Sequence, residues 1–588
     1  MATTTPLATS TPPSPQLHHP ACESQTTNIC EALVSLLTSL GIQHAYGVAG
    51  GAAAKIGDAL GRSTVHFVHC RHEAGAAFAA VETYFATGRP AVVFTTTGPG
   101  IMNALTGCSA ARHEGAKIVL LSAGTSAASR GRWACQETSS YRVPISGLFT
   151  AGPLFDYAVM MEHPSELAEI AARLERGLAR PGGFVAHISI PTALQSTTAL
   201  AYRRPCGLTT PPSCSDEAIQ DYAQMLRANP FVIWVGYGAR AAAAEIRTLA
   251  ERTGAPVMSS PRGKGIFPER HELFLGVTGL GGYGSIEEFM RTSRPAYTLV
   301  LGTRLGEATS FWQQNLVPEQ AFIHVDIDPE VPGTSYPEAL THAVHADVKS
   351  FIAALLDQCL SRPSVRVAPS RPPDTMSPSE PLRRAAIRPT MLMDAVQRVV
   401  VDGSEAIVMA ESGNAFTWAI HRLRFDVPGR FRVSVAYGSM GHMAAGVLGA
   451  SLARGDKAVA IVGDGAMLMN NEMSTAAQHR AKAVWIILND AGYGMVEQGM
   501  RALGLQPRDT SIPRVDFVQV ARGLGVEGVR VDDETALESA LVTAMAADGP
   551  YVVDVQIDAT EPGPWVERTR ALILQGTTRE CNDVEGLS

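Results

Sequence analysis

Two apolar runs in the last third of the chain, AVAIVGDGAMLMNNE (458–472) and AVWIILNDAGYG (483–494), end in glycine and short polar residues. A short apolar run that ends in this way is typical of a buried strand in a parallel sheet. Parallel strands present their carboxyl ends at one edge, where α/β proteins bind their ligands. The spacing between Asp464 and Asp490 suits one helix plus one strand, so we predict that the two polar ends converge.

The converging side chains would suit a magnesium ion. Mg²⁺ prefers oxygen ligands in octahedral geometry and usually shares them with a phosphate group. Asp464, the Asn489-Asp490 pair and a nearby backbone carbonyl supply such oxygens. Taken alone, the Gly-Asp-Gly triplet has a second interpretation, in which it is only a tight strand-to-helix turn with Asp464 as the helix N-cap.

Similar alternations of strand and helix patterns cover most of the chain and predict an α/β fold with three doubly wound parallel-sheet domains. The first helix should follow a capping box formed by Asn28 and Glu31. The predicted segments are a disordered tail (1–26), an N-terminal domain (27–195), a middle domain (215–360), a linker (361–389), a C-terminal domain (390–560) and a C-terminal tail (561–588). The first and third domains look alike in architecture, although no residue-level repeat is visible.

Composition excludes several classes of protein. The 588 residues are 46% hydrophobic and 18% charged, which argues for packed cores and against a disordered chain. A net charge of −8 without a long basic run disfavours nucleic acid as a partner. The nine scattered cysteines fit reduced thiols, and neither a membrane-spanning stretch nor a signal peptide is visible, so we expect a cytoplasmic protein.

The same motifs carry a family resemblance. HCRHEAGAAFAAVETYFATGRPAVVFTTTGPG (69–100), YGSMGHMAAGVLGA (437–450) and the spacing from Gly-Asp-Gly to Asn489-Asp490 resemble the thiamine-diphosphate enzymes. Within that superfamily the chain is similar to the acetolactate synthase, pyruvate oxidase and 2-oxo acid decarboxylase group over about residues 27–560. One departure is Asp490, which stands where asparagine is usual and adds a negative charge beside the diphosphate.

The resemblance implies a set of cofactor contacts. Mg²⁺ would be held by the side chains of Asp464 and Asp490 and by the carbonyl of Gly492. Glu73 would hydrogen-bond a pyrimidine nitrogen and drive tautomerisation of that ring, whereas His72 is expected to cap or pack. Read without the family, Glu73 is a helix-start acid favoured by the macrodipole. The remaining implied cofactor contacts are Gly413, Asn414, Gly438, Met440, Gly463, Gly465 and Met495.

The resemblance also implies substrate contacts. Gly50 and Gly51 lie in a loop that would overhang the thiazolium, Gln136 would be an active-site hydrogen-bond donor, and Arg304 would contact the carboxylate of the acceptor. Arg304 has an alternative interpretation as a surface or interdomain salt bridge. The acetolactate synthase pattern G-M-V-x-Q-W ends here in Gly499, and the missing indole opens volume for a larger acceptor.

These residues predict a carboligase that decarboxylates a 2-oxo acid such as pyruvate and transfers the acyl carbanion to a carbonyl acceptor. The alternatives are a 2-oxo acid decarboxylase, including the phosphonopyruvate and sulfopyruvate types, and a non-catalytic cofactor-binding protein. The paired-histidine motif of decarboxylases is absent at 111–114, which disfavours the first alternative. The resemblance further implies a homodimer or homotetramer with sites at the subunit interface, and it leaves FAD in the middle domain open.

Overall fold

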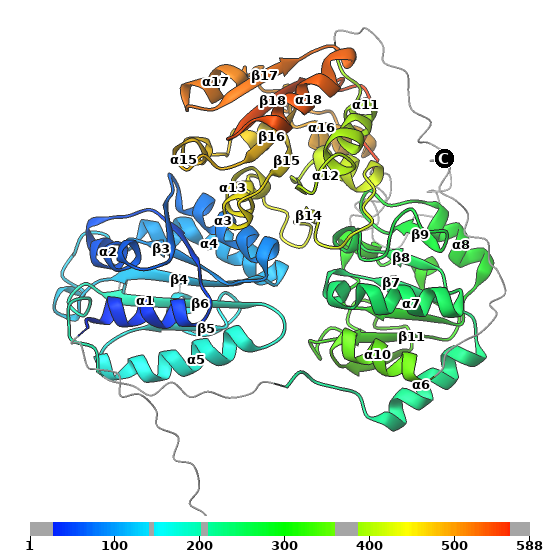
Figure 1. The fold of residues 1–588 in the computed structure, drawn as a ribbon, viewed down its shortest axis with the longest axis horizontal. Helices are drawn as coiled ribbons and strands as arrows, with labels where there is room; N and C mark the ends of the chain where they lie inside the picture. Colours follow the sequence, from blue (N-terminus) through cyan, green and yellow to red (C-terminus); the bar gives the residue numbers. More distant parts are fainter. Residues whose placement is uncertain (1–26, 140–145, 201–209, 359–385, 562, 565–588) are drawn as a thin grey trace, which may run out of the picture.

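The computed structural model describes residues 27–139, 146–200, 210–358, 386–561 and 563–564. Three six-stranded sheets, all parallel, are flanked by helices and occupy the three corners of the molecule (Figure 1). The predicted fold class is therefore confirmed. The predicted tail 1–26, most of the linker 361–389 and most of the tail 561–588 lie outside the described residues, and the domain boundaries stay predictions. No helix in the described part of the chain is long and apolar enough to cross a membrane.

The N-terminal sheet has the strand order β2-β1-β3-β4-β6-β5. Its first helix begins at the predicted capping box, because Asn28 Oδ1 accepts from Glu31 N at 3.0 Å and Glu31 Oε2 accepts from Asn28 N at 3.1 Å. Its elements are α1 (Ile29–Ser39), β1 (His44–Gly47), α2 (Ala54–Arg62), β2 (His66–His69), α3 (Glu73–Thr87), β3 (Ala91–Thr95), α4 (Pro99–Glu114), β4 (Lys117–Gly124), β5 (Tyr157–Met160), α5 (Leu167–Ala179) and β6 (Phe184–Pro191).

The middle sheet has the order β12-β11-β10-β7-β8-β9. Counted along the chain, this is the doubly wound order of dinucleotide-binding domains. Its elements are α6 (Asp216–Ala228), β7 (Phe231–Val235), α7 (Ala243–Thr253), β8 (Val257–Ser259), β9 (Phe274–Val277), α8 (Ser285–Ser293), β10 (Tyr297–Leu301), α9 (Glu307–Ser310), β11 (Ala321–Asp326), β12 (Thr341–His345) and α10 (Val348–Asp357).

The C-terminal sheet has the order β14-β13-β15-β16-β18-β17. Counted within each domain, this order is identical to that of the N-terminal sheet, as the similar architecture of the two sequence patterns suggested. Its elements are α11 (Pro389–Val396), β13 (Ile407–Ala410), α12 (Asn414–Arg422), β14 (Phe431–Val433), α13 (His442–Arg454), β15 (Ala458–Gly463), α14 (Asp464–Met467), α15 (Met473–Gln478), β16 (Ala483–Asn489), α16 (Gly494–Ala502), α17 (Phe517–Gly523), β17 (Glu527–Val531), α18 (Leu537–Ala546) and β18 (Tyr551–Gln556).

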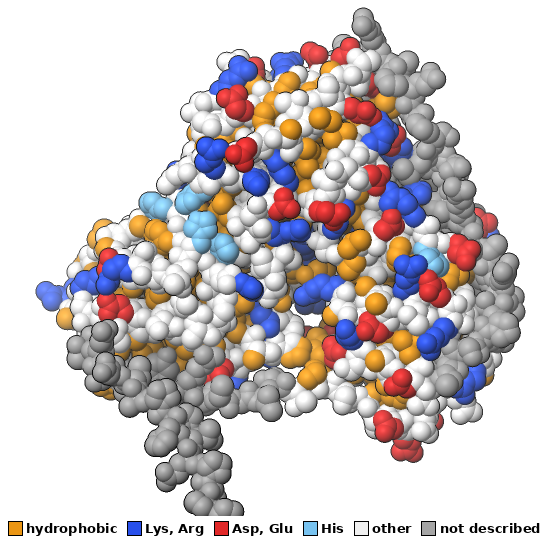
Figure 2. All heavy atoms as spheres, in the orientation of Figure 1, with side chains coloured by type: hydrophobic (Ala, Val, Ile, Leu, Met, Phe, Trp, Pro, Cys, Tyr) orange, Lys and Arg blue, Asp and Glu red, His pale blue; other side chains and the backbone are white. Residues whose placement is uncertain are grey.

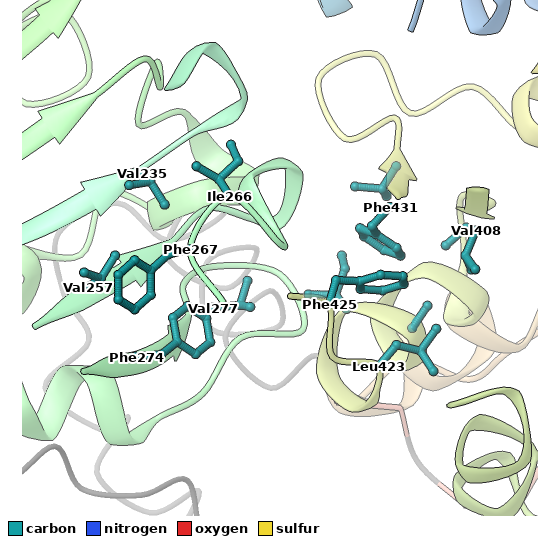
Figure 3. Close-up of a cluster of buried hydrophobic side chains, with 14 of the residues drawn as sticks. Val235, Val257, Ile266, Phe267, Phe274, Val277, Val408, Leu423, Phe425 and Phe431 are labelled. Atoms are coloured by element: carbon teal, nitrogen blue, oxygen red, sulfur yellow. The ribbon is translucent and has the colours of Figure 1, made fainter. Parts of the chain in front are cut away.

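The domains share cores as well as surfaces. One buried cluster runs from Phe267 and Phe274 in the middle domain to Phe425 and Phe431 in the C-terminal domain (Figure 3). Histidines gather where the N-terminal domain meets the C-terminal one (Figure 2), and the ring of His66 lies 5.6 Å from that of His479. The domains are therefore positioned by direct packing, which fixes the residues at their junctions.

Helices α3 and α13 form the closest junction between the N-terminal and C-terminal domains (Figure 1). A methyl group on Gly449 of α13 would lie 1.9 Å from the carbonyl oxygen of Ala79 on α3. Only glycine permits so close an approach, because any side chain would overlap the backbone of the other helix. Each helix follows the second strand of its domain, so α3 and α13 occupy equivalent places in the two equivalent sheets.

Candidate active site

A cavity of about 190 Å³ opens at the carboxyl edge of the C-terminal sheet, beyond the ends of β13, β15 and β16. Most of the residues predicted to bind the cofactor or the metal line it: Gly413, Asn414, Met440, Gly463, Asp464, Gly465, Asp490, Gly492 and Met495. The predicted convergence of the two strand ends is therefore what the structure has. The lining residues all come from the region 389–561.

Two carboxylates, Asp464 and Asp490, face this cavity from adjacent strands. Asp464 begins α14 and is 2% exposed, and its Oδ1 accepts from Gly465 N at 2.7 Å. Ala491 takes a left-handed conformation with φ of 59°, unusual for a residue with a side chain. The chain turns there and continues into Gly492, whose N–H donates to Asp464 Oδ2 at 3.2 Å. The turn thus connects the two strand ends directly.

The charges at this edge suit a divalent cation. Burial, followed by the charge of Asp464, raises the pKa of Asp490 to about 7, and burial raises the pKa of Asp464. No group of three or more His, Cys, Asp or Glu side chains in the described chain is arranged to hold a metal ion. Two carboxylates and the Gly492 carbonyl would leave coordination positions for phosphate oxygens and water. The residues present therefore fit Mg²⁺ shared with a diphosphate.

The facing wall carries amide groups. Asn414, at the start of α12, donates through Nδ2 to Gln498 Oε1 of α16 at 3.1 Å. Its buried Oδ1 accepts no hydrogen bond from the described residues. A methyl group on Gly494 would lie 2.6 Å from Asp490 Oδ2 and 3.2 Å from Asn414 Nδ2, so any side chain there would displace one of these two groups. The wall and the carboxylates are thus packed against each other.

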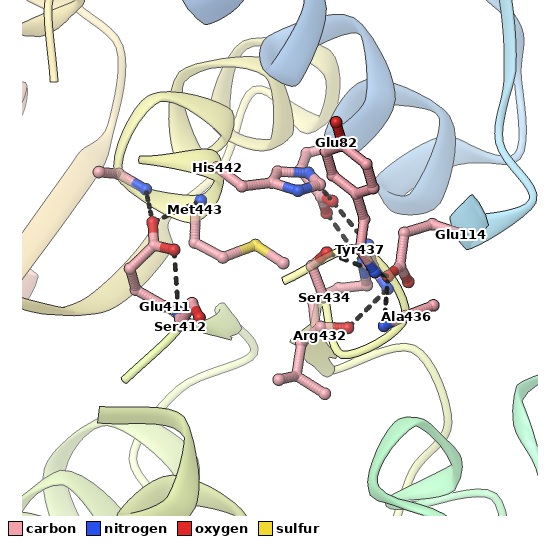
Figure 4. Close-up of polar contacts among 12 residues, drawn as sticks. Glu82, Glu114, Glu411, Ser412, Arg432, Ser434, Ala436, Tyr437, His442 and Met443 are labelled. Carbon is pink, nitrogen blue, oxygen red and sulfur yellow. Dashed lines mark hydrogen bonds and ion pairs between the residues drawn. The ribbon is translucent and has the colours of Figure 1, made fainter. Parts of the chain in front are cut away.

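Glu411 holds the backbone that follows Met440 (Figure 4). Glu411 is fully buried at the end of β13, and its Oε2 accepts from Met443 N at 2.8 Å and from Ala444 N at 3.0 Å. These N–H groups belong to the first turn of α13, where a carboxylate is favoured by the helix dipole. Burial raises the pKa of Glu411. This contact fixes the start of α13 directly after Met440.

An ion-pair cluster buried between the domains holds the same segment from the other side (Figure 4). Arg432 makes two hydrogen bonds to Glu82 of α3, at 2.6 and 2.9 Å. Burial acts to raise the pKa of Glu82, but Arg432 lowers it to about 2. Glu114 Oε1 accepts from Ser434 Oγ and from Ala436 N, both at 3.0 Å. The Met440 segment is thus tied to α3 and α4.

Glu73 lies at the first position of α3, outside the cavity lining of its own chain. It is 7% exposed, and its Oε2 accepts from Asn103 Nδ2 at 3.0 Å. His72 caps the helix as expected, because its Nδ1 accepts from Ala74 N at 3.1 Å. A carboxyl group with one hydrogen-bond partner retains capacity for a second one.

Comparisons with known proteins identify the domains. Residues 27–143 match the thiamine pyrophosphate enzyme N-terminal TPP binding domain, residues 219–355 the central domain, and residues 411–555 the C-terminal TPP binding domain. Thiamine pyrophosphate is another name for thiamine diphosphate. The chain belongs to the thiamine pyrophosphate enzyme family. The predicted family is therefore confirmed, and the family's own domain description supports thiamine diphosphate as the cofactor.

The relatives with named activities include both an acetolactate synthase and a decarboxylase. The large subunit of acetolactate synthase isozyme 1 from Escherichia coli is 28% identical, with 90% of this chain and 94% of that protein covered. A probable 2-ketoarginine decarboxylase of Pseudomonas aeruginosa is 26% identical, with 91% and 95% covered. A 4-hydroxybenzoylformate decarboxylase of Rhodococcus jostii shares the fold, with a TM-score of 0.78 at 22% identity and with 90% and 99% covered.

The substrate residues predicted for this family member lie outside the cavity lining of the single chain. Arg304 donates through Nη1 to the carbonyl oxygen of His113 at 2.8 Å, so it joins the middle and N-terminal domains. Gln136 is exposed with φ of 54°, and its Oε1 accepts from Thr97 Oγ1 at 3.2 Å. Gly50 packs on Thr96, Gly51 is exposed, and Gly438 has φ of 66° just before Met440. Their proposed roles stay predictions.

Three further residues at or beside this site were not singled out from the sequence: Glu411, Tyr493 and Gln498. Gln498 stands in the G-M-V-x-Q motif and Tyr493 in the run 483–494, so both were in view as part of a motif. A methyl group on Gly465 would lie 2.7 Å from the ring of Tyr493, which makes Tyr493 part of the same wall. Their roles depend on contacts between distant segments, and sequence spacing gives no signal for those.

Proposed function

We propose that the protein is a thiamine-diphosphate- and Mg²⁺-dependent carboligase. It would decarboxylate a 2-oxo acid, with pyruvate as the first candidate, and transfer the acyl group to an aldehyde or ketone. The observation that carries the cofactor assignment is the convergence of Asp464, Asp490 and Asn414 on one cavity. The acetolactate synthase relative, which is similar over 90% of this chain, supports the carboligase reaction.

Each residue has a distinct part in this proposal. Asp464, Asp490 and the Gly492 carbonyl would hold Mg²⁺ and through it the diphosphate, and Met440 would support the bend between the two rings. When bound, thiamine diphosphate supplies a nucleophilic carbon and an electron sink for the loss of CO₂. Glu73 would hold a proton at the pyrimidine nitrogen, and Arg304 would receive the carboxylate of the acceptor.

We also propose that the active unit is a dimer. All lining residues of the cavity come from the C-terminal part of the chain, whereas Glu73 belongs to the N-terminal domain. A second copy that presents its Glu73 to the open side of the cavity would complete the site. A mixture of Glu73→Gln and Asp464→Ala chains tests this directly. If the two inactive variants regain activity when mixed, one intact site has been assembled from two chains.

A 2-oxo acid decarboxylase is the second candidate, favoured by the 2-ketoarginine decarboxylase among the relatives. The segment 111–114 weighs against it, because its sequence Ala-Arg-His-Glu lacks the paired histidines expected of a decarboxylase of this family. Glu114 instead pairs with Arg262 of the middle domain at 3.1 Å.

Product analysis separates the candidates. Purified protein would be given thiamine diphosphate, Mg²⁺ and pyruvate, with and without a panel of aldehydes and ketones, and the products would be identified by mass. Product that forms only with an acceptor supports the carboligase. Free aldehyde from the 2-oxo acid alone supports the decarboxylase. A protein that binds the cofactor and releases CO₂ from none of a panel of 2-oxo acids would be a non-catalytic member.

A further inference from the structure

The backbone directly before Glu73 is held by a residue of the C-terminal domain. Glu472 is fully buried, and its Oε1 accepts from His72 N at 3.0 Å. Both of its carboxylate oxygens also lie 3.2 Å from Arg71 N. Two consecutive peptide N–H groups therefore point at one carboxylate that is 400 residues away in sequence.

The fit between Glu472 and α3 is close. A methyl group on Gly75, in the first turn of α3, would lie 2.6 Å from Glu472 Oε1 and 2.8 Å from its Cγ. The absence of a side chain at Gly75 leaves the space that the Glu472 carboxylate occupies. The side chain of Arg71 extends the contact, since it donates to Ser474 at 3.0 Å and to Gln478 at 2.7 Å.

Neutral donors rather than a cation satisfy Glu472 in the described structure. Thr475 Oγ1 donates to Glu472 Oε2 at 2.6 Å. The backbone N–H of Glu472 donates to Asn470 Oδ1 at 2.9 Å. The carboxylate also lies at the start of a 15-residue helix, where the helix dipole favours negative charge. Because breaking hydrogen bonds to a buried carboxylate is costly, Glu472 restrains the backbone N–H groups of Arg71 and His72.

We propose that Glu472 is a positioning residue for Glu73. It holds the peptide groups of Arg71 and His72, and these set where the Glu73 carboxyl stands, together with the hydrogen bond from Asn103. This inference rests on the proposed function, in which Glu73 meets the pyrimidine ring. Glu472 and Asp464 belong to one short segment of the chain. In the proposed dimer, Asp464 binds the metal of one site, while Glu472 of the same chain positions the Glu73 that enters the other site.

The first test needs no cofactor. In the Glu472→Gln variant a neutral amide with one acceptor oxygen replaces a carboxylate with two. We expect amide hydrogen exchange at residues 71 and 72 of the apo-protein to become about 10-fold faster. Thr475→Val removes one donor to Glu472 with little change in shape, so a smaller change in the same direction is expected even if the first variant fails to fold. Unchanged exchange at 71 and 72 in a folded variant would overturn the proposal.

The second test uses hybrid dimers made from two differently tagged chains. One chain carries Asp464→Ala and supplies Glu73 to the single intact site, and the other carries Glu73→Gln and supplies Asp464. Glu472→Gln on the first chain should lower kcat of that site by about 10- to 100-fold, as loss of a supporting contact does elsewhere. The same change on the second chain should leave kcat unchanged. Equal losses from both placements would contradict a positioning role.

A matched control separates positioning from general loosening. Glu269 is another buried carboxylate that accepts a backbone N–H, from Gly265 at 3.2 Å, and it lies in the middle domain, where it also pairs with Lys264 at 2.7 Å. Glu269→Gln should lower stability without distinguishing the two chains of the hybrid. If hybrids without any change at Glu472 show no turnover, the proposed dimer fails, whereas the exchange measurement still decides the contact of Glu472 with residues 71 and 72.

Discussion

The N-terminal and C-terminal domains use one strand order for different tasks. In the C-terminal domain the edge of the sheet carries two acidic strand ends, Asp464 and Asp490, and a cavity. The N-terminal domain has the same topology and instead presents an acid, Glu73, at the start of α3. The shared fold therefore positions equivalent helices and edges, and a few polar residues decide what each edge does.

The equivalent helices α3 and α13 extend this comparison. The start of α13 is held by Glu411 from its own domain, whereas the start of α3 is held by Glu472 from the other domain. The start of α13 also meets the other domain, since His442 Nε2 lies 3.0 Å from Glu82 Oε1 of α3. The difference is that a carboxylate of the same domain binds the first N–H groups of α13, whereas the N–H groups before α3 are bound only by a carboxylate of the other domain among the contacts described above.

The largest effect is expected from Glu73→Gln. Replacing the acid removes proton exchange with the pyrimidine ring, which is typically worth about 10² to 10⁴ in rate. Affinity for thiamine diphosphate with Mg²⁺ should change little, since the diphosphate would be held by the C-terminal domain. Steady-state turnover and a cofactor binding titration give the two values. Unchanged turnover would refute the role of Glu73 and leave only its place at the helix start.

The helix junction should be the next most sensitive point. Gly449→Ala places a methyl group 1.9 Å from the Ala79 carbonyl and would force α3 and α13 apart. We expect the free energy of unfolding to fall by about 3 kcal/mol, the upper range for overpacking. Gly61→Ala in α2 is the control, because its methyl group meets no atom within 4 Å. Equal thermal stability of the two variants would argue against a tight junction.

Acid should destabilise the N-terminal domain more than the equivalent C-terminal domain. His187 is the fourth residue of β6, and Asp554 is the fourth residue of the equivalent strand β18; both are fully buried. Burial lowers the pKa of His187 to about 4 from 6.5, so the unfolded chain binds a proton more readily and stability falls as pH drops through that window. Burial raises the pKa of Asp554, so the folded state binds its proton more readily than the unfolded chain does. The destabilisation that the buried carboxylate causes therefore becomes smaller as pH falls.

From pH 7 to pH 5 the His187 contribution amounts to about 2 kcal/mol lost from the N-terminal domain. Hydrogen exchange corrected for intrinsic rates would follow residues 184–191 and 551–556 separately. Protection should decrease in the first segment and be maintained in the second. A parallel decrease in both segments would indicate that the two domains unfold as one unit and that the two buried groups do not act separately.

The sequence predicted the central strands and the convergence of Asp464 and Asp490 well, because apolar runs ending in glycine are strong local signals. It gave no strand for β5, β9, β12 and β17, each of which is a short strand at the edge of its sheet. A run of only four or five residues is a weak signal, even where it is apolar as in β5 and β9. Strands were also predicted too long at their polar ends. For example, the sequence RFRVSVAYG (430–438) favours one strand over its whole length, whereas β14 covers only Phe431–Val433. In that case the chain leaves the sheet early to reach Met440.

Contacts between domains were out of reach of sequence reasoning. Nothing near Glu472 indicates that it accepts from Arg71 and His72, and Gly75 is only one of several small residues in its helix. Arg304 illustrates the same difficulty, since its bond to the His113 carbonyl depends on how the middle domain packs. Local patterns specify strands and their ends, whereas the partners of a buried polar group depend on tertiary packing that spacing does not encode.

The smallest of the expected effects tests the wall of the cavity with two glycines of one helix, α16. In Gly494→Ala the new methyl group would lie 2.6 Å from Asp490 Oδ2, so the carboxylate must shift from its present place. We expect affinity for Mg²⁺ with thiamine diphosphate to fall about 10-fold, as displaced supporting contacts do at metal sites. Gly499→Ala meets no atom within 4 Å and should leave affinity unchanged. It should also stabilise the helix by up to about 1 kcal/mol.

A titration of both variants with Mg²⁺ and thiamine diphosphate, followed by fluorescence, gives the comparison. Equal affinities would place the cofactor away from Asp490 and would limit the metal site to Asp464.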